Sequence, residues 1–313
     1  MPDFITLNKE KIGLGEQREV LLNVSRLPTH TPIDLPVYIS RSEFDGPVLL
    51  LTGGLHGDEI NGVEIVRRMI DKGIWIPERG TVIAMPIVNV YGFIQNVRGL
   101  PDGKDINRSF PGIKEGSLAR LLAYTLMNEV IPNIDYGVDF HTGGASRANY
   151  PQIRCDLKRS ENEELAKAFG APITLHSPMI SKSFRKAAYN KGKPILVYEA
   201  GESMRMDEYG VEQAINGTMR LMKYLGLNSS APEMIEADVY QKSSWIRAKI
   251  AGLFQPKFSL GDTISKRQVI GYINDPYGNS STKVVVTRDA RIIGLNNNPY
   301  VHKGDAIAHI AYN

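Results

Sequence analysis

The 313-residue chain has little of what marks several classes of protein. Its single cysteine, Cys155, excludes a disulfide framework and a cysteine-rich metal site. Its apolar runs are short, well below the roughly 20 residues that span a bilayer. Lys and Arg total 37 against 34 Asp and Glu, a balance that argues against a nucleic-acid partner held through phosphates. The N-terminus lacks a charged-then-apolar signal pattern, so we expect a cytoplasmic protein with no membrane partner.

Short apolar runs alternate with helical patterns through most of the chain. The runs that predict buried strands are 47–51, 81–87, 136–140, 173–175 and 194–198. Apolar residues at helical spacing predict helices over 63–70, 118–130 and 214–225. This alternation predicts an α/β fold in which a mixed sheet is flanked by helices.

The pattern changes near residue 235, after which short β-rich runs follow one another without a helical stretch. Ala248–Leu253 is echoed by Ala290–Leu295, and Leu260–Ile264 is echoed by Lys303–Ile307. Two copies of a short β unit predict a small closed or sandwiched β-domain. We therefore expect a catalytic domain over 1–235 and a β-rich domain over 236–313, joined by a linker near Ser229–Pro232.

Two histidines lie where apolar strands end in glycine turns. His56 and Glu59 follow the first run, three residues apart, and His141 follows Asp139 at the end of another. Carboxyl ends of strands are where open α/β sheets bind ligands, and two imidazoles with a carboxylate suit zinc. A fourth position then remains for water, which is the catalytic arrangement. Surface positions are expected for His30, His302 and His309, and packing roles for Trp75 and Trp245.

A segment rich in Gly and Pro supplies polar groups for this site. We expect Asp105 to hold the outer ring nitrogen of a ligand histidine. Asn107 and Arg108 form a compact unit for binding a carboxylate, since Arg offers a planar fork and Asn a neutral donor. Arg98 brings positive charge to a developing oxyanion.

A hydrolase also needs a general base. Glu199 ends the apolar run 194–198, where partial burial would raise the pKa of its carboxyl toward a useful range. Glu202 is the competing candidate, and we prefer Glu199 for its position at the end of the strand.

These motifs together resemble the succinylglutamate desuccinylase/aspartoacylase family, which is related to the zinc carboxypeptidases. The matching segments, over roughly residues 30–313, are Gly54-Leu-His56-Gly-Asp-Glu59, Asp105-Ile-Asn107-Arg108-Ser-Phe-Pro-Gly112, Asp139-Phe-His141-Thr-Gly143 and Glu199-Ala-Gly201. Ile106 stands where the family pattern has Leu, a minor departure.

The resemblance implies one zinc ion per chain, held by His56, Glu59 and His141, with Glu199 as the base. It implies an amidohydrolase that removes an acyl group from a small N-acyl amino acid. Arg154 and Arg185 are further candidates for binding the acyl or side-chain end. The C-terminal repeat resembles a lipoyl-like barrel-sandwich fold, and the family's members often associate as homo-oligomers.

Two alternatives remain open. A carboxypeptidase-like peptidase that trims a C-terminal residue would use the same ligands and the same carboxylate anchor. A non-catalytic lipoyl-like carrier is disfavoured, because the stretch 274–283 between the half-repeats has only Lys283 at its edge and no central acceptor lysine.

Overall fold

The computed structural model describes residues 4–313. Across these residues, thirteen strands form one mixed sheet: β3 Gln17–Arg26, β4 Pro32–Arg41, β5 Val48–Thr52, β6 Thr81–Met85, β7 Tyr136–Gly143, β8 Arg147–Cys155, β9 Ile173–His176, β10 Ile195–Glu202, β11 Asp238–Tyr240, β12 Lys242–Arg247, β14 Thr263–Ile264, β17 Ala290–Asn296 and β19 Ala306–Tyr312. The central order is β12-β19-β17-β8-β10-β7-β5-β6-β4-β3, with β9, β11 and β14 attached beside it.

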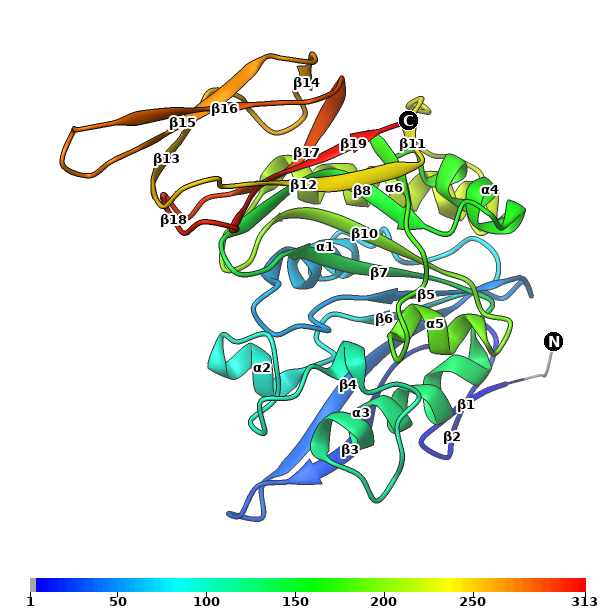
Figure 1. Ribbon diagram of the computed structural model, residues 1–313. Coiled ribbons are helices and arrows are strands. Elements are labelled where there is room, and N and C mark those ends of the chain that lie inside the picture. Colours follow the sequence, from blue (N-terminus) through cyan, green and yellow to red (C-terminus); the bar gives the residue numbers. More distant parts are fainter. Residues whose placement is uncertain (1–3) are drawn as a thin grey trace.

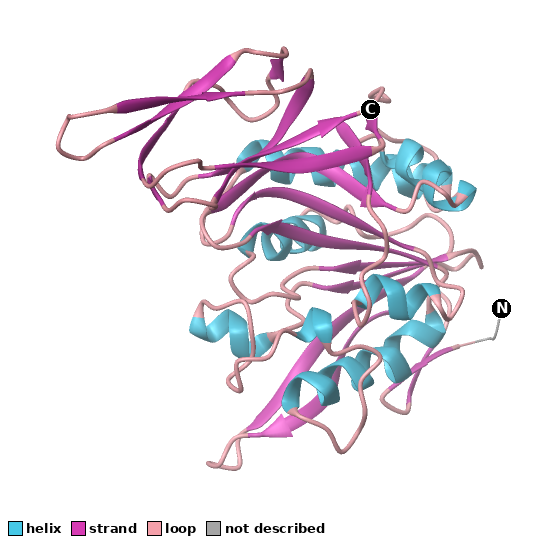
Figure 2. Cartoon of the chain, viewed as in Figure 1, coloured by secondary structure: helices cyan, strands magenta, loops and turns pink. Residues whose placement is uncertain are grey.

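Helices cover both faces of this sheet (Figures 1 and 2). They are α1 Ile60–Asp71, α2 Val90–Gln95, α3 Leu118–Thr125, α4 Ser160–Phe169, α5 Phe184–Tyr189 and α6 Glu208–Tyr224. Successive residues of β5 belong to different cores: Leu50 packs with α3 and α5, whereas Leu49 packs with α1, α4 and α6. Because side chains alternate along a strand, a strand buried on both faces needs an unbroken apolar sequence.

The predicted α/β architecture is confirmed, and each predicted apolar run overlaps a strand, although the run 81–87 extends two residues beyond β6. The predicted helices correspond to α1, α3 and α6. Helix α3 ends at Thr125 and is followed by one wider helical turn, Leu126–Val130. Strands β3, β4 and β8 were not predicted. The sequence of β8, RANYPQIRC, lacks an apolar run, and its burial depends on pairing with β10.

The C-terminal part is β-rich, as predicted, and its strands after β11 pair antiparallel with one another. Beyond β11, strands β13 Gly252–Pro256, β15 Val269–Asn274, β16 Ser281–Val285 and β18 Tyr300–Val301 form a separate four-stranded sheet. Meanwhile β17 pairs with β8, so β17, β19 and β12 extend the main sheet. The domain boundary near residue 235 stays a prediction, because hydrogen-bonded strands connect the two parts (Figure 1).

Three central strands place the candidate site. β10, β7 and β5 lie side by side and parallel, so their carboxyl ends meet at one edge of the sheet. Elsewhere, β1 Ile5–Leu7 and β2 Glu10–Ile12 form a small hairpin. Among the described residues, every helix is too short or too polar to cross a lipid bilayer.

Candidate metal centre and active site

The glycines around His56 permit a very tight loop after β5. A Cβ atom at Gly57 would lie 1.8 Å from the carbonyl carbon of Gly92 in α2, so no side chain fits between the two segments. Gly54 adopts φ +56°, a left-handed conformation that glycine enters without a steric cost. This close packing fixes the turn that carries His56 toward the sheet edge.

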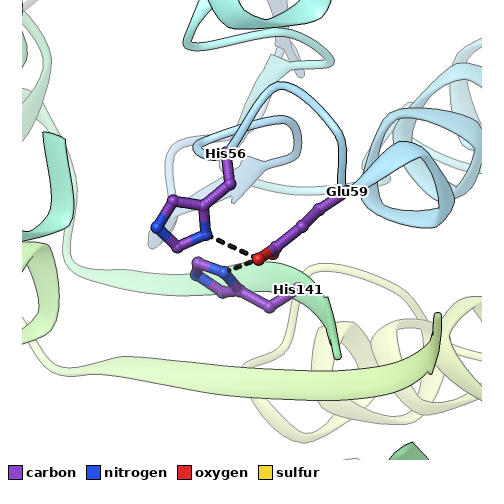
Figure 3. A group of neighbouring side chains, drawn as sticks. All are labelled: His56, Glu59 and His141. Atoms are coloured by element: carbon purple, nitrogen blue, oxygen red, sulfur yellow. Dashed lines mark hydrogen bonds and ion pairs between the residues drawn. The ribbon is translucent and has the colours of Figure 1, made fainter. Parts of the chain in front are cut away.

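Three side chains converge near the carboxyl ends of β5 and β7 (Figure 3). The ring atom Nδ1 of His56 lies 2.7 Å from Oε1 of Glu59, and Nδ1 of His141 lies 2.8 Å from Oε2. One ligand atom from each residue lies within 4.8 Å of the others, and all three side chains are buried. Two imidazole nitrogens and a carboxylate at these separations suit a divalent transition metal, with zinc the best fit.

The opposite nitrogen of each ring faces a carboxylate. Nε2 of His56 lies 3.2 Å from Oδ1 of Asp105, the residue that the sequence predicts for this contact. Nε2 of His141 lies 2.7 Å from Oδ2 of Asp139, whose other oxygen accepts a hydrogen bond from Thr52. Such outer contacts fix the ring orientation and leave both Nδ1 atoms for a metal.

Electrostatics favour a cation at this cluster. Burial alone would raise the pKa of Glu59, but the two imidazoles hold the pKa of that carboxyl well below its usual range. Burial opposes charge on His141, yet Asp139 and Glu59 outweigh it and raise the pKa of the ring well above its usual value. The negative field that attracts a proton here also attracts a divalent ion.

Arg98 lies against the same cluster rather than apart from it. Its guanidinium donates to Oε1 of Glu59 at 3.0 Å and to Oδ2 of Asp105 at 3.0 Å. The predicted positive charge therefore lies next to the candidate metal ligands.

Glu199 lies directly across the ladder from His141, because β10 and β7 pair in register at these two residues. Its Oε2 accepts from Nδ2 of Asn149 at 2.7 Å, and its Oε1 faces Arg154 at 3.2 Å. Glu202, the competing candidate, instead accepts a hydrogen bond from Asn297 in the C-terminal part. The strand end thus presents Glu199, and not Glu202, to the cavity.

A cavity of about 510 Å³ opens over these groups. It is lined by the three candidate ligands, Glu199, Arg98, Asn107, Arg108, Arg154 and Arg185, among others. The side-chain oxygen of Asn107 accepts from the backbone N–H of Phe184 at 2.9 Å, which leaves its amide nitrogen as a donor. Arg108 donates to the carbonyl of Asn107. The predicted substrate-binding residues therefore lie in one cavity with the candidate metal centre.

Arg185 also has a structural role that the sequence did not indicate. Its guanidinium donates to the backbone carbonyls of Arg154, Ser177 and Pro178, at 2.7, 3.1 and 3.0 Å. It is buried and largely committed to these partners.

One expectation was wrong, and another was incomplete. His309 is not at the surface: it is 7% exposed and stacks on Trp245, with ring centroids 4.5 Å apart. Trp245 is not only a packing residue, since its indole lines the cavity. The contact of Asp139 with His141 could have been predicted from the sequence, because residues two apart on a strand share a face. The contact of Asn149 with Glu199 has no such signal in the sequence, because it depends on how β8 pairs with β10.

Comparison with known proteins assigns the chain to a family. The model of the succinylglutamate desuccinylase/aspartoacylase catalytic domain matches residues 45–225, more than half of the chain. The chain belongs to this family. All the predicted site residues lie within the matched segment.

Relatives of the family cover nearly the whole chain. An N-alpha-acetyl-L-2,4-diaminobutyric acid deacetylase of Halomonas elongata is 28% identical over 289 residues, covering 85% of this chain and 82% of its own. A succinylglutamate desuccinylase/aspartoacylase structure from Rhodobacter sphaeroides is 25% identical with a TM-score of 0.83, covering 95% of both chains. A product-bound ectoine utilization protein from Ruegeria pomeroyi has the same fold, with 20% identity, a TM-score of 0.84 and full coverage of both chains.

Proposed function

We propose that this protein is a zinc-dependent amidohydrolase that removes an acyl group from a small N-acyl amino acid. The observation that supports this most directly is the His56–Glu59–His141 cluster at a cavity that also contains Glu199 and Arg108. The family assignment points the same way, and the relative from H. elongata is a deacetylase.

The residues present fit one zinc ion per chain. His56, Glu59 and His141 would hold it, and their outer contacts with Asp105 and Asp139 resemble the carboxylate–histidine pairs of zinc sites. Zinc bound there would acidify a water molecule and polarise the amide carbonyl.

The side chains around the cluster then have separate tasks. Asn107 and Arg108 bind the substrate carboxylate, through an amide N–H and a planar guanidinium. Glu199 takes the proton from the attacking water and passes it to the leaving amine. Asn149 and Arg154 hold the Glu199 carboxylate in place from β8. Arg98 adds positive charge where the oxyanion develops.

Cavity size favours a deacylase over a peptidase. A volume of about 510 Å³ suits a small molecule, and Trp245 from the C-terminal part is among the residues that line it.

The test measures zinc content and amine release with a panel of acetyl, succinyl and formyl amino acids and two dipeptides. We expect one zinc per chain, turnover of at least one N-acyl amino acid, and weak or no cleavage of dipeptides. Glu199→Gln should retain zinc but lose about 100-fold or more in kcat. Glu202→Gln serves as the matched control on the same strand and should keep most activity.

Several outcomes would contradict the proposal. If the Glu199→Gln variant kept its activity, Glu199 would not be the general base. Cleavage of dipeptides alone would establish the peptidase alternative. If the wild-type protein retained no zinc and hydrolysed no amide, the proposal of a zinc-dependent amidohydrolase would be excluded.

A further inference from the structure

A second cavity, of about 640 Å³, lies next to the one over the candidate metal centre. Of the described residues, Arg108 alone lines both cavities. The walls of the second cavity come from the segment 104–112, the start of α3 and the loop before α5, and its polar residues include Lys104, Asp105, Arg108, Ser117, Arg120 and Lys182. The proposed function gives this cavity no role.

Positive charge predominates in the lining of this second cavity. Lys104 has a carboxylate partner, Asp102, at 3.5 Å. The side chains of Arg120 and Lys182 make no recorded hydrogen bond or ion pair with residues 4–313. Arg108 contacts one backbone carbonyl and, in the same part of the chain, no carboxylate. Three cations at one cavity are therefore available to an anion.

The carboxylate in this lining is already engaged by other groups. Oδ1 of Asp105 faces Nε2 of His56 at 3.2 Å, and Oδ2 accepts a hydrogen bond from Arg98 at 3.0 Å. Glu115, in the loop before α3, does not line the cavity. Within the described chain, the three cations thus have no counter-charge of their own.

Apolar walls and a helix end strengthen the positive field here. Phe110 and Pro111 belong to the lining, and Phe110 is buried against Phe184, with ring centroids 5.0 Å apart. Helix α3 begins directly after Ser117, another lining residue, so the positive end of its dipole adds to the side-chain charges. A cleft with low-dielectric walls and charge of one sign concentrates ions of the opposite sign.

The chemistry of these cations matches a phosphate group. A guanidinium pairs with phosphate oxygens through two parallel hydrogen bonds, and an ammonium adds a point charge. A phosphate dianion offers enough charge and oxygens for all three cations, whereas a single carboxylate would leave some of them unpaired. A volume of about 640 Å³ is within the range of small-molecule sites, so a phosphate group with a small organic part attached also fits.

We propose that the second cavity binds a phosphate group, and that the bound phosphate weakens substrate binding by engaging Arg108. The second part rests on the proposed function, in which Arg108 binds the substrate carboxylate. One guanidinium cannot make a full bidentate pair with two anions at once. Each ligand therefore lowers the protein's affinity for the other by the same factor. The cavity is thus an inhibitory site for an anion that is not the substrate.

The experiment first measures binding to the zinc-loaded, full-length protein in phosphate-free buffer. Isothermal titration calorimetry compares inorganic phosphate, glycerol 3-phosphate and glycerol, at constant ionic strength because salt screens exposed charges. We expect saturable binding of at least one phosphate compound and no binding of glycerol. Tighter binding of glycerol 3-phosphate would identify a phosphorylated metabolite as the ligand, and equal binding would identify the free anion.

Steady-state kinetics then tests the link through Arg108, with an N-acyl amino acid that the enzyme hydrolyses. As the phosphate compound saturates, KM should rise about 10-fold to a plateau with kcat nearly unchanged, since one charge-assisted pair is lost. The plateau distinguishes this mechanism from phosphate bound in the first cavity, because direct displacement of the substrate would raise KM without limit.

Variants assign the binding to the second cavity. Arg120→Gln and Lys182→Gln should each weaken phosphate binding about 10-fold, and Arg120→Lys should weaken it less. Neither residue lines the first cavity, so KM without phosphate should stay unchanged. Lys114→Gln is the matched control, because Lys114 is an exposed lysine in the loop before α3 that lines neither cavity.

The possible failures can be told apart. No saturable phosphate binding, or binding that is unchanged in Arg120→Gln and Lys182→Gln, would overturn the proposed site. Binding that both variants weaken, with a wild-type KM that phosphate does not change, would overturn the coupling through Arg108. Phosphate binding by a protein that hydrolyses no N-acyl amino acid would support the site and count against the proposed function.

Discussion

The neighbours of His141 orient its ring for metal binding. Asp139 lies two residues earlier on β7, on the same face, and its second oxygen is held by Thr52. This chain of contacts presents Nδ1 toward Glu59 and fixes the ring before a metal arrives.

Replacing Asp139 by Asn should therefore weaken metal binding without unfolding the protein. We expect zinc affinity to fall by about 10- to 100-fold, as is usual for outer contacts of metal-binding histidines. Competition with a chromogenic chelator measures this, with Asp102→Asn as a surface control. An unchanged affinity would mean that Asp139 does not orient the ring.

His309 predicts an acid-sensitive contribution to stability. Burial, and then the nearby Arg154, lower the pKa of its ring to about 3, whereas the unfolded chain has an ordinary histidine pKa near 6.5. Between these values the unfolded chain binds more protons, so this contribution is intact above pH 6.5 and is lost progressively as the pH falls toward 3. The slope is at most about 1.4 kcal/mol per pH unit.

Urea unfolding of the zinc-loaded protein at several pH values from 4.5 to 7.5 tests this. His309→Asn should unfold with a weaker pH dependence than the wild type, and the exposed His302→Asn should not differ from it. Parallel curves for the wild type and His309→Asn would disprove the assignment.

Between secondary-structure elements, one arginine connects several segments. Arg185, in α5, donates to carbonyls of β8 and of the irregular stretch Ser177–Pro178. These carbonyls need a donor where water is excluded, which explains why so polar a side chain is buried.

Arg185→Met should consequently destabilise the fold. We expect a loss of about 3 kcal/mol or more in the free energy of unfolding, because three acceptors lose their partner. Chemical denaturation measures it, with the exposed Arg205→Met as a control. Unchanged stability with a raised KM would instead support the role in substrate binding that the sequence suggested.

Across the whole molecule, the two predicted domains share one sheet. β17 pairs with β8 beside Asn149, the partner of Glu199, and Gln152 of β8 donates to the carbonyl of Ile293. Ile293 also packs with Ile173 and Leu175 of β9 in one small core.

A chain ending at residue 235 should therefore fail to form a stable monomer, because it exposes that core and leaves backbone groups of β8 without partners. Size-exclusion chromatography and thermal unfolding provide the measurement. As a control, replacing residues 275–280 with Asn-Gly shortens only the exposed β15–β16 hairpin and should preserve the fold. A truncated chain that unfolds cooperatively as a monomer would show that residue 235 is a true domain boundary.

Local sequence determined much of this protein. Unbroken apolar runs specify the central strands, because both faces of such strands are buried. The glycine turn after β5 places His56, and the last residues of β7 include His141; the two meet because parallel strands end at the same edge. The motifs that contain Asp105, Asn107 and Glu199, in this order along the chain, predict which polar side chains belong to the site.

Other features were decided only by tertiary structure. β8 has no apolar pattern and becomes a central strand because β10 and β17 pair with it on either side. Asn149 reaches Glu199, and His309 supports Trp245, through pairings between segments 50 and 64 residues apart in the sequence (199 − 149 and 309 − 245). Pairing of this kind depends on the register of the whole sheet, which no local pattern of residues contains.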